Sequence, residues 1–419
     1  MTTQPGPFLW GASSAPHQIE GNNVNSDWWL YEQRMPHFNP SGDAVDSYHR
    51  YEEDMQLLAD AGLTAYRFGI EWARVEPLPG QFSLAELAHY RRMIDTALHL
   101  GLTPVITLHH FSSPRWFIEE GGWLGETALD RFTAYVTRVC TILDGVEWVC
   151  TINEPNMFAF MMLMAGAINS DAAPVMDTPT IQQEGGFTLP LPLPEGTQRL
   201  IEAHHAARAI VRERTRAKVG WTIAGLALSA ADPSAEDRLQ SERYAREDVF
   251  LEASRGDDFL GVQAYSTQTV DADGLVPHPP SPDNTLVGTP YRPDALGIAV
   301  RHAWEITNGV PILITENGIA TEDDSRRIAY TSDALFHLFA AMDDGIDVRG
   351  YLHWTALDNF EWGHWEPTFG LISVDRTTFT RTPKPSLAWL GSLARQGGPD
   401  APLILRTPAP PAHLPVTAP

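Results

Sequence analysis

The sequence predicts an α/β protein, a single (β/α)8 TIM barrel of parallel strands that alternate with helices. Three observations lead to this fold. Short apolar segments alternate with longer segments of helical periodicity along most of the chain. Two of the apolar segments lead to a glutamate. Glu154 comes two residues after the segment 149–152, and Glu316 directly follows the segment 311–315. Long segments rich in Pro and Gly follow the fourth and sixth expected strands, where a barrel carries its functional loops.

The expected strands are apolar runs bounded by glycine, proline or polar residues. They cover residues 8–11, 63–70, 103–108, 147–152, 217–224, 258–265, 311–316 and 348–354. The expected helices have apolar residues three and four positions apart, and one of them runs from a capping box at Ser83 to a stop at Gly101. The other helices are expected at 48–61, 127–143, 157–167, 200–215, 234–253, 294–307, 331–343 and 385–393.

Loops and boundaries complete the predicted organisation. The segments 169–196 and 267–290 are expected to be long loops at the mouth of the barrel, because proline and glycine interrupt any periodic pattern there. We expect one barrel domain over residues 1–396, followed by a Pro-rich C-terminal tail at 397–419.

Composition narrows the classes of function. Hydrophobic residues make up 43% of the chain, which is enough for a large packed core. The net charge of −24 argues against nucleic acid, anionic membranes and phosphorylated substrates, and favours a neutral ligand. Cys140 and Cys150 are the two cysteines, too few for a disulfide framework, and we expect buried free thiols. Without a signal-peptide pattern, a cytoplasmic location is expected.

No cofactor or metal is indicated. The sequence has no cluster of ligands with metal-site spacing and no glycine-rich phosphate loop. The net charge leads us to expect a neutral small molecule as the partner, and neither nucleic acid nor a membrane. The oligomeric state is not indicated by any of these patterns.

Two glutamates, Glu154 and Glu316, are presented by different strands of the expected barrel. The carboxyl ends of barrel strands meet on one face, so both carboxyls are expected in one cleft. A pair of carboxyls in one cleft suits glycoside hydrolysis, with a separation of about 5–5.5 Å for a retaining mechanism. The alternative is that the two glutamates are ordinary strand-end charges that cap helices or form ion pairs.

Six segments in order carry a resemblance to a known family. They are FLWGASSAPHQIEG at 8–21, the stretch at 46–77, TINEP at 151–155, DFLGVQAYS at 258–266, ITENG at 314–318 and WTALDNFEW at 354–362. Together they resemble glycoside hydrolase family 1, which contains β-glucosidases, β-galactosidases and related retaining enzymes. The resemblance implies a TIM barrel and a two-glutamate double-displacement mechanism.

The resemblance assigns catalytic roles to four residues. Glu154 matches the general acid/base and Glu316 matches the nucleophile. Arg67 and Tyr265 match residues that hold the nucleophile, and a guanidinium and a phenol donor near Glu316 would keep it ionised. The charge of Glu316 would in turn keep Glu154 protonated until the covalent intermediate forms.

The resemblance also assigns sugar recognition. The expected substrate-binding residues are Gln18, His110, Asn153, Trp354, Glu361 and Trp362, with Trp354 as the platform beneath the sugar ring. Asn153 is expected to contact the hydroxyl next to the anomeric carbon. The alternatives are core packing for the two tryptophans, a hydrogen-bonded core histidine for His110 and a loop cap for Gln18.

The chain departs from the family pattern at several positions. Phe111 stands where a tryptophan is usual, Gln263 and Ala264 replace an Asn-Tyr pair, and Glu71 replaces a small polar residue with no evident reason. Glu361, with Glu366 close by in sequence, occupies the region where phospho-glycosidases of the family bind phosphate, so a sugar phosphate would be repelled.

The predicted function is a retaining β-glycosidase that hydrolyses non-phosphorylated β-D-glycosides, foremost a β-glucosidase, with β-galactosidase or β-fucosidase activity also open. Two alternatives remain. The same machinery could serve mainly as a transglycosylase, or the barrel could be a catalytically silent glycoside-binding protein.

Overall fold

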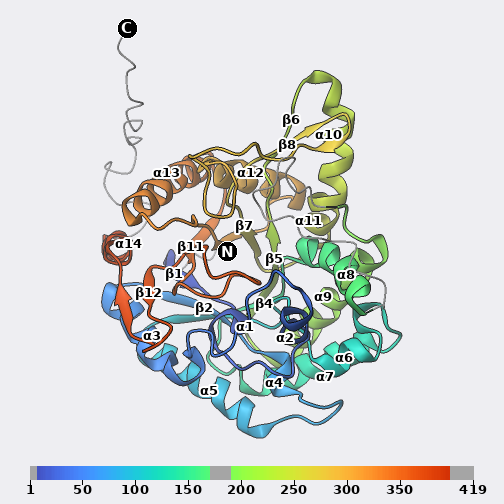
Figure 1. The fold of residues 1–419 in the computed structure, drawn as a ribbon, viewed down its shortest axis with the longest axis vertical. Coiled ribbons are helices and arrows are strands. Elements are labelled where there is room, and N and C mark those ends of the chain that lie inside the picture. The colour runs from blue at the N-terminus through green and yellow to red at the C-terminus, as the bar shows by residue number, and fades with distance from the viewer. Residues whose placement is uncertain (1–6, 170–189, 397–419) are drawn as a thin grey trace, which may run out of the picture.

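The structure, a computed structural model, describes residues 7–169 and 190–396. Its centre is a closed barrel of parallel strands in the order β1-β11-β10-β7-β5-β4-β3-β2 (Figure 1). These strands are β1 (Leu9–Ser13), β2 (Ala65–Gly69), β3 (Thr103–Thr107), β4 (Trp148–Asn153), β5 (Lys218–Ala224), β7 (Leu260–Gln263), β10 (Ile312–Glu316) and β11 (Val348–Trp354). The predicted TIM barrel is confirmed.

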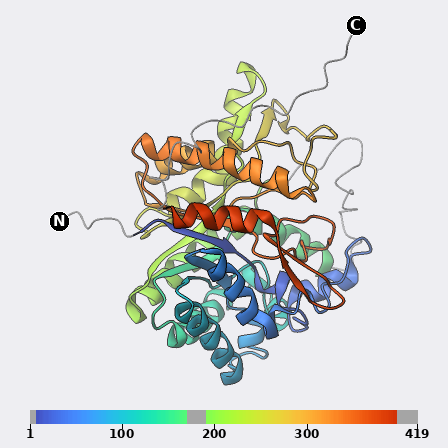
Figure 2. The same ribbon diagram turned by 90° about the vertical axis from the view of Figure 1, so that its left-hand side faces the viewer.

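Helices surround the barrel, as the two perpendicular views show (Figures 1 and 2). They bury their apolar faces against the outside of the strands, and the largest core cluster fills this layer. The main helices are α3 (Ser47–Ala61), α5 (Leu84–His99), α7 (Ala128–Val139), α8 (Pro155–Asn169), α9 (Pro194–Arg214), α12 (Ala295–Thr307), α13 (Asp324–Asp343) and α14 (Pro385–Arg395). The predicted cap of α5 is present, because the Ser83 side chain accepts from Glu86 N.

The inside of the barrel is also packed. A second cluster contains one buried apolar side chain from most of the strands or their edges, so the lower part of the barrel is a core and not a channel. This cluster consists of Leu9, Ala65, Val105, Trp148, Cys150, Phe259, Leu313 and Leu352. Both cysteines are buried and free. The polar side chains of the candidate active site therefore lie at the opposite, C-terminal end of the strands.

Several elements differ from the prediction. Helix α9 begins at Pro194, inside the segment expected to be loop, because proline suits the first position of a helix. Helix α13 begins at Asp324, seven residues before its predicted start at 331, and the Asp323 side chain caps it by accepting from Ser325 N and Arg326 N. The predicted loop at 267–290 contains β8 (Gln268–Asp271) and β9 (Gly274–Leu275), which form a sheet with β6 (Leu228–Ala230).

The remaining elements are short. They are α1 (Pro16–Ile19), α2 (Asp27–Arg34), α4 (Trp72–Val75), α6 (Arg115–Glu119), α10 (Glu236–Arg243), α11 (Val249–Ala253), a π-helical turn at Tyr244–Asp248, single 3-10 turns, and the hairpin β12 (Ile372–Val374) and β13 (Arg381–Pro383). Most of the predicted loop 169–196 and the whole predicted tail 397–419 lie outside the described residues. Among the helices that are described, none has the length and apolar character needed to cross a bilayer.

Candidate active site

The two predicted carboxyls, on Glu154 and Glu316, line one cavity at the C-terminal end of the barrel. Glu316 is the last residue of β10, and Glu154 lies between the end of β4 and the start of α8 at Pro155. The cavity has a volume of about 380 Å³. Both glutamates therefore face the same space from strands that are far apart in the sequence, as the barrel geometry requires.

Glu316 is held at both carboxylate oxygens. Arg67 Nη1 donates to Oε1 over 2.6 Å, and the Tyr265 hydroxyl donates to Oε2 over 2.6 Å. Arg67 comes from β2 and is fully buried, and its Nε donates to Thr107 Oγ1 at the end of β3 over 2.9 Å. This fixes the guanidinium plane. The charge and both donors favour the ionised form of Glu316.

Glu154 has a different environment. Its carboxyl has no hydrogen bond or ion pair with another described residue. Burial raises the pKa of Glu154 well above its ordinary value, and the negative charge of Glu316 raises it further. Burial also raises the pKa of Glu316, but Arg67 and the Tyr265 hydrogen bond lower it. Because only Glu316 has these compensating donors, Glu316 ionises first and Glu154 keeps its proton.

Asn153, the residue before Glu154, is the centre of a hydrogen-bond cluster. Its Oδ1 accepts from Arg67 Nη2 over 2.5 Å, from Thr222 Oγ1 over 3.0 Å and from Gln263 Nε2 over 3.0 Å. Its Nδ2 is buried and has no hydrogen-bond partner among the described residues. Asn153 lines the cavity, so an amide donor is available there.

Glu361 and Gln18 lie together at another part of the site. Gln18 Nε2 donates to Glu361 Oε2 over 3.0 Å and to the carbonyl oxygen of Phe360 over 2.8 Å. Glu361 lines the cavity, whereas Gln18 is completely buried behind it. Burial raises the pKa of Glu361 to about 8. Glu361 Oε1 and Gln18 Oε1 are buried without a hydrogen-bond partner in the described part of the chain.

Aromatic rings form one wall of the cavity. The His110 ring lies near both predicted tryptophans, with its centroid 5.8 Å from that of Trp354 and 5.9 Å from that of Trp362. Burial lowers the pKa of His110 well below its ordinary value, so its ring is neutral and has both a donor and an acceptor nitrogen. All three rings line the cavity together with Phe111 and Phe369. The structure thus brings every predicted site residue to the cavity or into hydrogen-bond contact with a residue that lines it.

Three non-glycine residues that line the cavity have left-handed backbone angles. The φ values are 64° at Phe111, 41° at Glu154 and 45° at Trp362. Side chains other than glycine seldom adopt this region, at a cost of about 1–2 kcal/mol for a residue with a Cβ atom. Each of these residues follows a strand or lies in a loop where the chain must turn to present its side chain inward.

A second cavity adjoins the first. It has a volume of about 350 Å³, and both cavities are lined by Glu154, Met157 and Tyr265. Its other walls come from β5, β7 and the segment that contains β8, including Gln263, Gln268 and His278. Glu154 therefore lies between two spaces, whereas Glu316 lines only the first.

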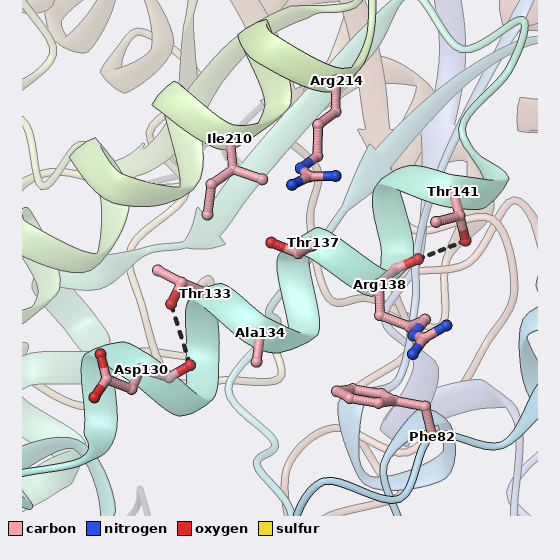
Figure 3. Close-up of a pocket in the computed structure, with 9 residues that line it drawn as sticks. All are labelled: Phe82, Asp130, Thr133, Ala134, Thr137, Arg138, Thr141, Ile210 and Arg214. Carbon is pink, nitrogen blue, oxygen red and sulfur yellow. Dashed lines mark hydrogen bonds between the residues drawn. The ribbon is translucent and has the colours of Figure 1, made fainter.

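A groove on the outside of the barrel contains none of the predicted site residues. It is lined by α7, α9 and Phe82, and Arg214 extends from α9 toward α7, whereas Arg138 extends from α7 toward Phe82 (Figure 3). The guanidinium of Arg138 lies over the ring of Phe82 at 5.1 Å from the centroid. Thr133 and Thr141 donate to backbone carbonyls of their own helix and turn, so their hydroxyls are already used.

Sequence reasoning missed Thr107 and Thr222, which hold Arg67 and Asn153. Each is a polar residue at or near the end of an apolar strand, and this was the available signal. It also left Glu71 without a role. Glu71 Oε1 accepts from Ala73 N and so caps α4, and Oε2 accepts from Ser112 Oγ over 2.6 Å. Glu71 thus connects the loop after β2 to the loop after β3.

A barrel that presents one ionised and one protonated glutamate to a single cavity has the arrangement of a glycoside hydrolase. Comparison with known proteins agrees. The profile of glycosyl hydrolase family 1 matches residues 1–258 and 254–399, and the chain belongs to this family.

The relatives match most of the length of the chain. Thermostable beta-glucosidase B of Thermobispora bispora is 30% identical over 94% of this chain and 91% of its own. A bifunctional beta-D-glucosidase/beta-D-fucosidase of Bifidobacterium breve is 28% identical over 92% and 96%. Among solved structures, a beta-glucosidase in the apo state is 42% identical with a TM-score of 0.83, covering 94% of this chain and 100% of its own. A beta-glycosidase from Pyrococcus horikoshii is 32% identical with a TM-score of 0.81, covering 93% and 95%.

Proposed function

We propose that this protein is a retaining β-glucosidase that acts on non-phosphorylated β-D-glucosides, with Glu316 as nucleophile and Glu154 as general acid/base. One observation carries the assignment of roles. Arg67 and Tyr265 donate to the two oxygens of Glu316, whereas the Glu154 carboxyl has no donor among the described residues. The two relatives named above, a β-glucosidase and a combined β-glucosidase and β-fucosidase, support the substrate class.

In the first step a Glu316 carboxylate oxygen forms a bond to the anomeric carbon while the glycosidic bond to the leaving oxygen breaks. Glu154 transfers its proton to that oxygen, and the aglycone leaves as an alcohol or phenol. Arg67 and Tyr265 hold Glu316 in position and limit its rotation. The product of this step is a glycosyl ester on Glu316.

In the second step the role of Glu154 reverses. Esterification removes the charge of Glu316 that raised the pKa of Glu154, so Glu154 is now ionised and accepts a proton from water. The water oxygen bonds to the anomeric carbon, the ester bond to Glu316 breaks, and β-glucose is released. Both carboxyls return to their original states.

Sugar binding is assigned to polar atoms that the protein leaves unpaired. Buried amide and carboxyl atoms without a partner are costly, and sugar hydroxyls would satisfy them. We assign Asn153, Glu361 and Gln18 to this role, with His110 and Trp362 beside them and Trp354 as the platform under the ring. The described residues that line the cavity include no lysine or arginine, which supports a substrate without phosphate.

The leaving group is assigned to the second cavity. Glu154 must lie next to the leaving oxygen to protonate it, and Glu154 is shared by the two cavities. The sugar would occupy the cavity that Glu316 lines, and the aglycone would extend past Met157 toward Gln268 and His278. The cavity volume of about 350 Å³ is compatible with a second sugar or an aryl group.

We also propose a reducing, cytoplasmic location. Cys140 and Cys150 are both buried as free thiols, and oxidising compartments favour disulfides in exported proteins. Fractionation of the source cells with a cytoplasmic marker enzyme tests this. Recovery of the protein with secreted or envelope fractions would contradict it.

The decisive experiment compares wild type with Glu316→Gly on p-nitrophenyl β-D-glucoside, with and without azide. Wild type should release nitrophenol, and the variant should lose this activity because no nucleophile remains. Azide is small enough to enter the vacated space and attack the anomeric carbon. Restored release with an α-glucosyl azide product identifies Glu316 as the nucleophile of a retaining enzyme.

Two other outcomes would favour the alternatives. Absence of nitrophenol release by wild type from the glucoside, galactoside, fucoside and xyloside would support a silent binding protein. Release of nitrophenol with little free glucose and much disaccharide, at moderate acceptor concentration, would support a transglycosylase. Product analysis of the wild-type reaction separates these outcomes from hydrolysis.

A further inference from the structure

We propose that Gln263 is a positioning residue that fixes the side-chain amide of Asn153 and thereby sets how strongly the enzyme prefers substrates with a hydroxyl next to the anomeric carbon. This inference rests on the proposed function, which assigns Asn153 to the sugar, and on the expectation that Asn153 contacts this hydroxyl. Gln263 is the last residue of β7 and is 1% exposed. Its Nε2 donates to Asn153 Oδ1 over 3.0 Å and not to Glu316.

The orientation of the Asn153 amide follows from the chemistry of its partners. Arg67 is a donor only, so the Asn153 atom that it contacts at 2.5 Å must be the oxygen. Thr222 Oγ1 lies 3.3 Å from Glu154 N, from which it accepts, and its own proton is then directed to Asn153 Oδ1 at 3.0 Å. The nitrogen of the Asn153 amide is therefore the atom left unpaired among the described residues.

The same chemistry fixes Gln263. Because it faces an oxygen, Gln263 must present its NH₂ group, and its own Oε1 is buried without a partner in the described residues. The strand register supports this contact. On β5, Asn153 is paired with Thr222 and Gln263 is paired with Ala224 two residues further on, so the two side chains belong to the same face of the sheet. The Gln263 amide thus connects β7, which lies beside the strand that ends at Glu316, to β4, which leads to Glu154.

The bridge has a specific consequence for the reaction. With Arg67 and Thr222 on one oxygen, the Asn153 amide can still tilt about its Cβ–Cγ bond, and the third donor from β7 restricts this tilt. The direction of Nδ2 is then fixed toward the cavity that Asn153 lines. A hydrogen bond to the hydroxyl beside the anomeric carbon strengthens in the transition state, so its geometry affects kcat more than KM.

The test is a comparison of two substrates with the same leaving group. For each variant, kcat/KM is measured for p-nitrophenyl β-D-glucoside and for its 2-deoxy analogue, and the ratio of the two values is calculated. The difference in intrinsic reactivity of the two substrates cancels when ratios are compared between variants. Gln263→Met, which keeps the length of the side chain but removes the donor, should lower the ratio about two- to tenfold, mainly through kcat on the glucoside.

A double-variant comparison shows whether Gln263 acts through Asn153. In an Asn153→Ala background the further change Gln263→Met should leave the ratio unchanged, because the amide that Gln263 positions is absent. Gln263→Leu is a second variant that also lacks a donor and cannot acquire one by protonation, so it should lower the ratio in the same direction. Gln56→Met, on the exposed face of α3 where the amide bonds Asp60, is the matched control and should leave the ratio unchanged.

Three results would overturn the inference. One is an unchanged ratio with unchanged activity on both substrates in folded Gln263→Met and Gln263→Leu. Another is an equal fall in the activity on both substrates, which indicates a structural role only. The third is the same fall of the ratio with and without Asn153. If the wild-type enzyme is active, each of these three results leaves the proposed function intact. If the wild-type enzyme is inactive on every glycoside, the proposed function and this inference both fail.

Discussion

Arg67 Nη1 lies 2.6 Å from Glu316 Oε1, and the arginine side chain of this ion pair is fully buried. Removal of one partner of a buried pair leaves an uncompensated charge, at a cost of about 3–5 kcal/mol. We therefore expect Arg67→Met to lower the free energy of unfolding by about this amount at neutral pH and to reduce kcat by at least about a hundredfold.

The measurements are denaturant unfolding and steady-state kinetics on p-nitrophenyl β-D-glucoside. Arg67→Lys is the matched control, because it retains the charge but cannot donate to Glu316, Asn153 and Thr107 together. Its stability should lie between those of wild type and Arg67→Met. Stability of Arg67→Met equal to that of wild type would contradict the prediction.

The Tyr265 hydroxyl should control the acidic limb of the pH profile. Its hydrogen bond to Glu316 Oε2 lowers the pKa of Glu316, so Tyr265→Phe should raise that pKa. The nucleophile must be ionised, and the acidic limb of kcat/KM should therefore move to higher pH. The check is the pH dependence of kcat/KM; a shift toward lower pH would show that Tyr265 acts differently.

Glu154→Gln should separate substrates by their leaving group. An amide cannot transfer a proton to the leaving oxygen, so a substrate with an alkyl aglycone should lose about 10³-fold in kcat/KM. A dinitrophenyl glucoside needs no protonation and should lose much less in the same step. Equal losses on both substrates would argue against Glu154 as the general acid. Thermal unfolding of the variant verifies that it is folded.

Sugar binding should release a proton from Glu361. Burial raises the pKa of this carboxyl to about 8, so it is mostly protonated at pH 7 in the free enzyme. Sugar hydroxyls that donate to it stabilise the carboxylate and lower this pKa on binding. Affinity for a non-hydrolysable thioglucoside should then rise as pH increases from 6 to 8. Calorimetry in buffers of different ionisation enthalpy measures the proton release, and Glu361→Gln should abolish it.

Asp27 should make the protein less stable as the pH rises. Burial raises its pKa to about 8, although Oδ1 accepts from Ser113 N and Trp28 N. Because the folded state binds this proton more tightly than the unfolded state, the contribution of Asp27 to stability is present below its unfolded pKa and is lost progressively up to pH 8. Asp27→Asn, which keeps an acceptor at Oδ1, should flatten the fall of Tm between pH 5 and 8.

For a chain of this size, each kcal/mol of stability lost corresponds to a fall of at most about 2 °C in Tm. The matched control is Asp273→Asn on the surface, which should leave the slope unchanged. A slope in Asp27→Asn equal to that of wild type would show that Asp27 is not the group responsible.

The sequence was sufficient for the barrel and for the two carboxyls, because an apolar strand that ends in a glutamate presents that carboxyl at the face where barrel strands meet. It was not sufficient for the partner of Gln263. Which side chains of β4 and β7 meet across β5 depends on the stagger of a closed barrel, and the pairing of Asn153 with Thr222 follows a register shift in β4 that has no sequence signature. The role of Glu71 is similar, because its partner Ser112 lies in a different loop.

Helix starts were missed for a local reason. The predicted start of α13 at 331 followed the apolar positions, but the helix begins at Asp324 because Asp323 caps a first turn of polar residues. The three-stranded sheet of β6, β8 and β9 was missed because its strands are only two to four residues long. Elements this short contain too few residues for a periodic pattern.

The left-handed backbone of Phe111, Glu154 and Trp362 places activity and heat resistance in opposition at this site. Together these residues carry backbone strain of several kcal/mol, which is comparable to the net free energy of unfolding of a folded domain. Replacement of Glu154 by glycine would release part of this strain and would at the same time remove the acid. A search for heat-resistant variants that ignores turnover would therefore select against the residues that perform the reaction, whereas one that preserves turnover must find its gains elsewhere in the barrel.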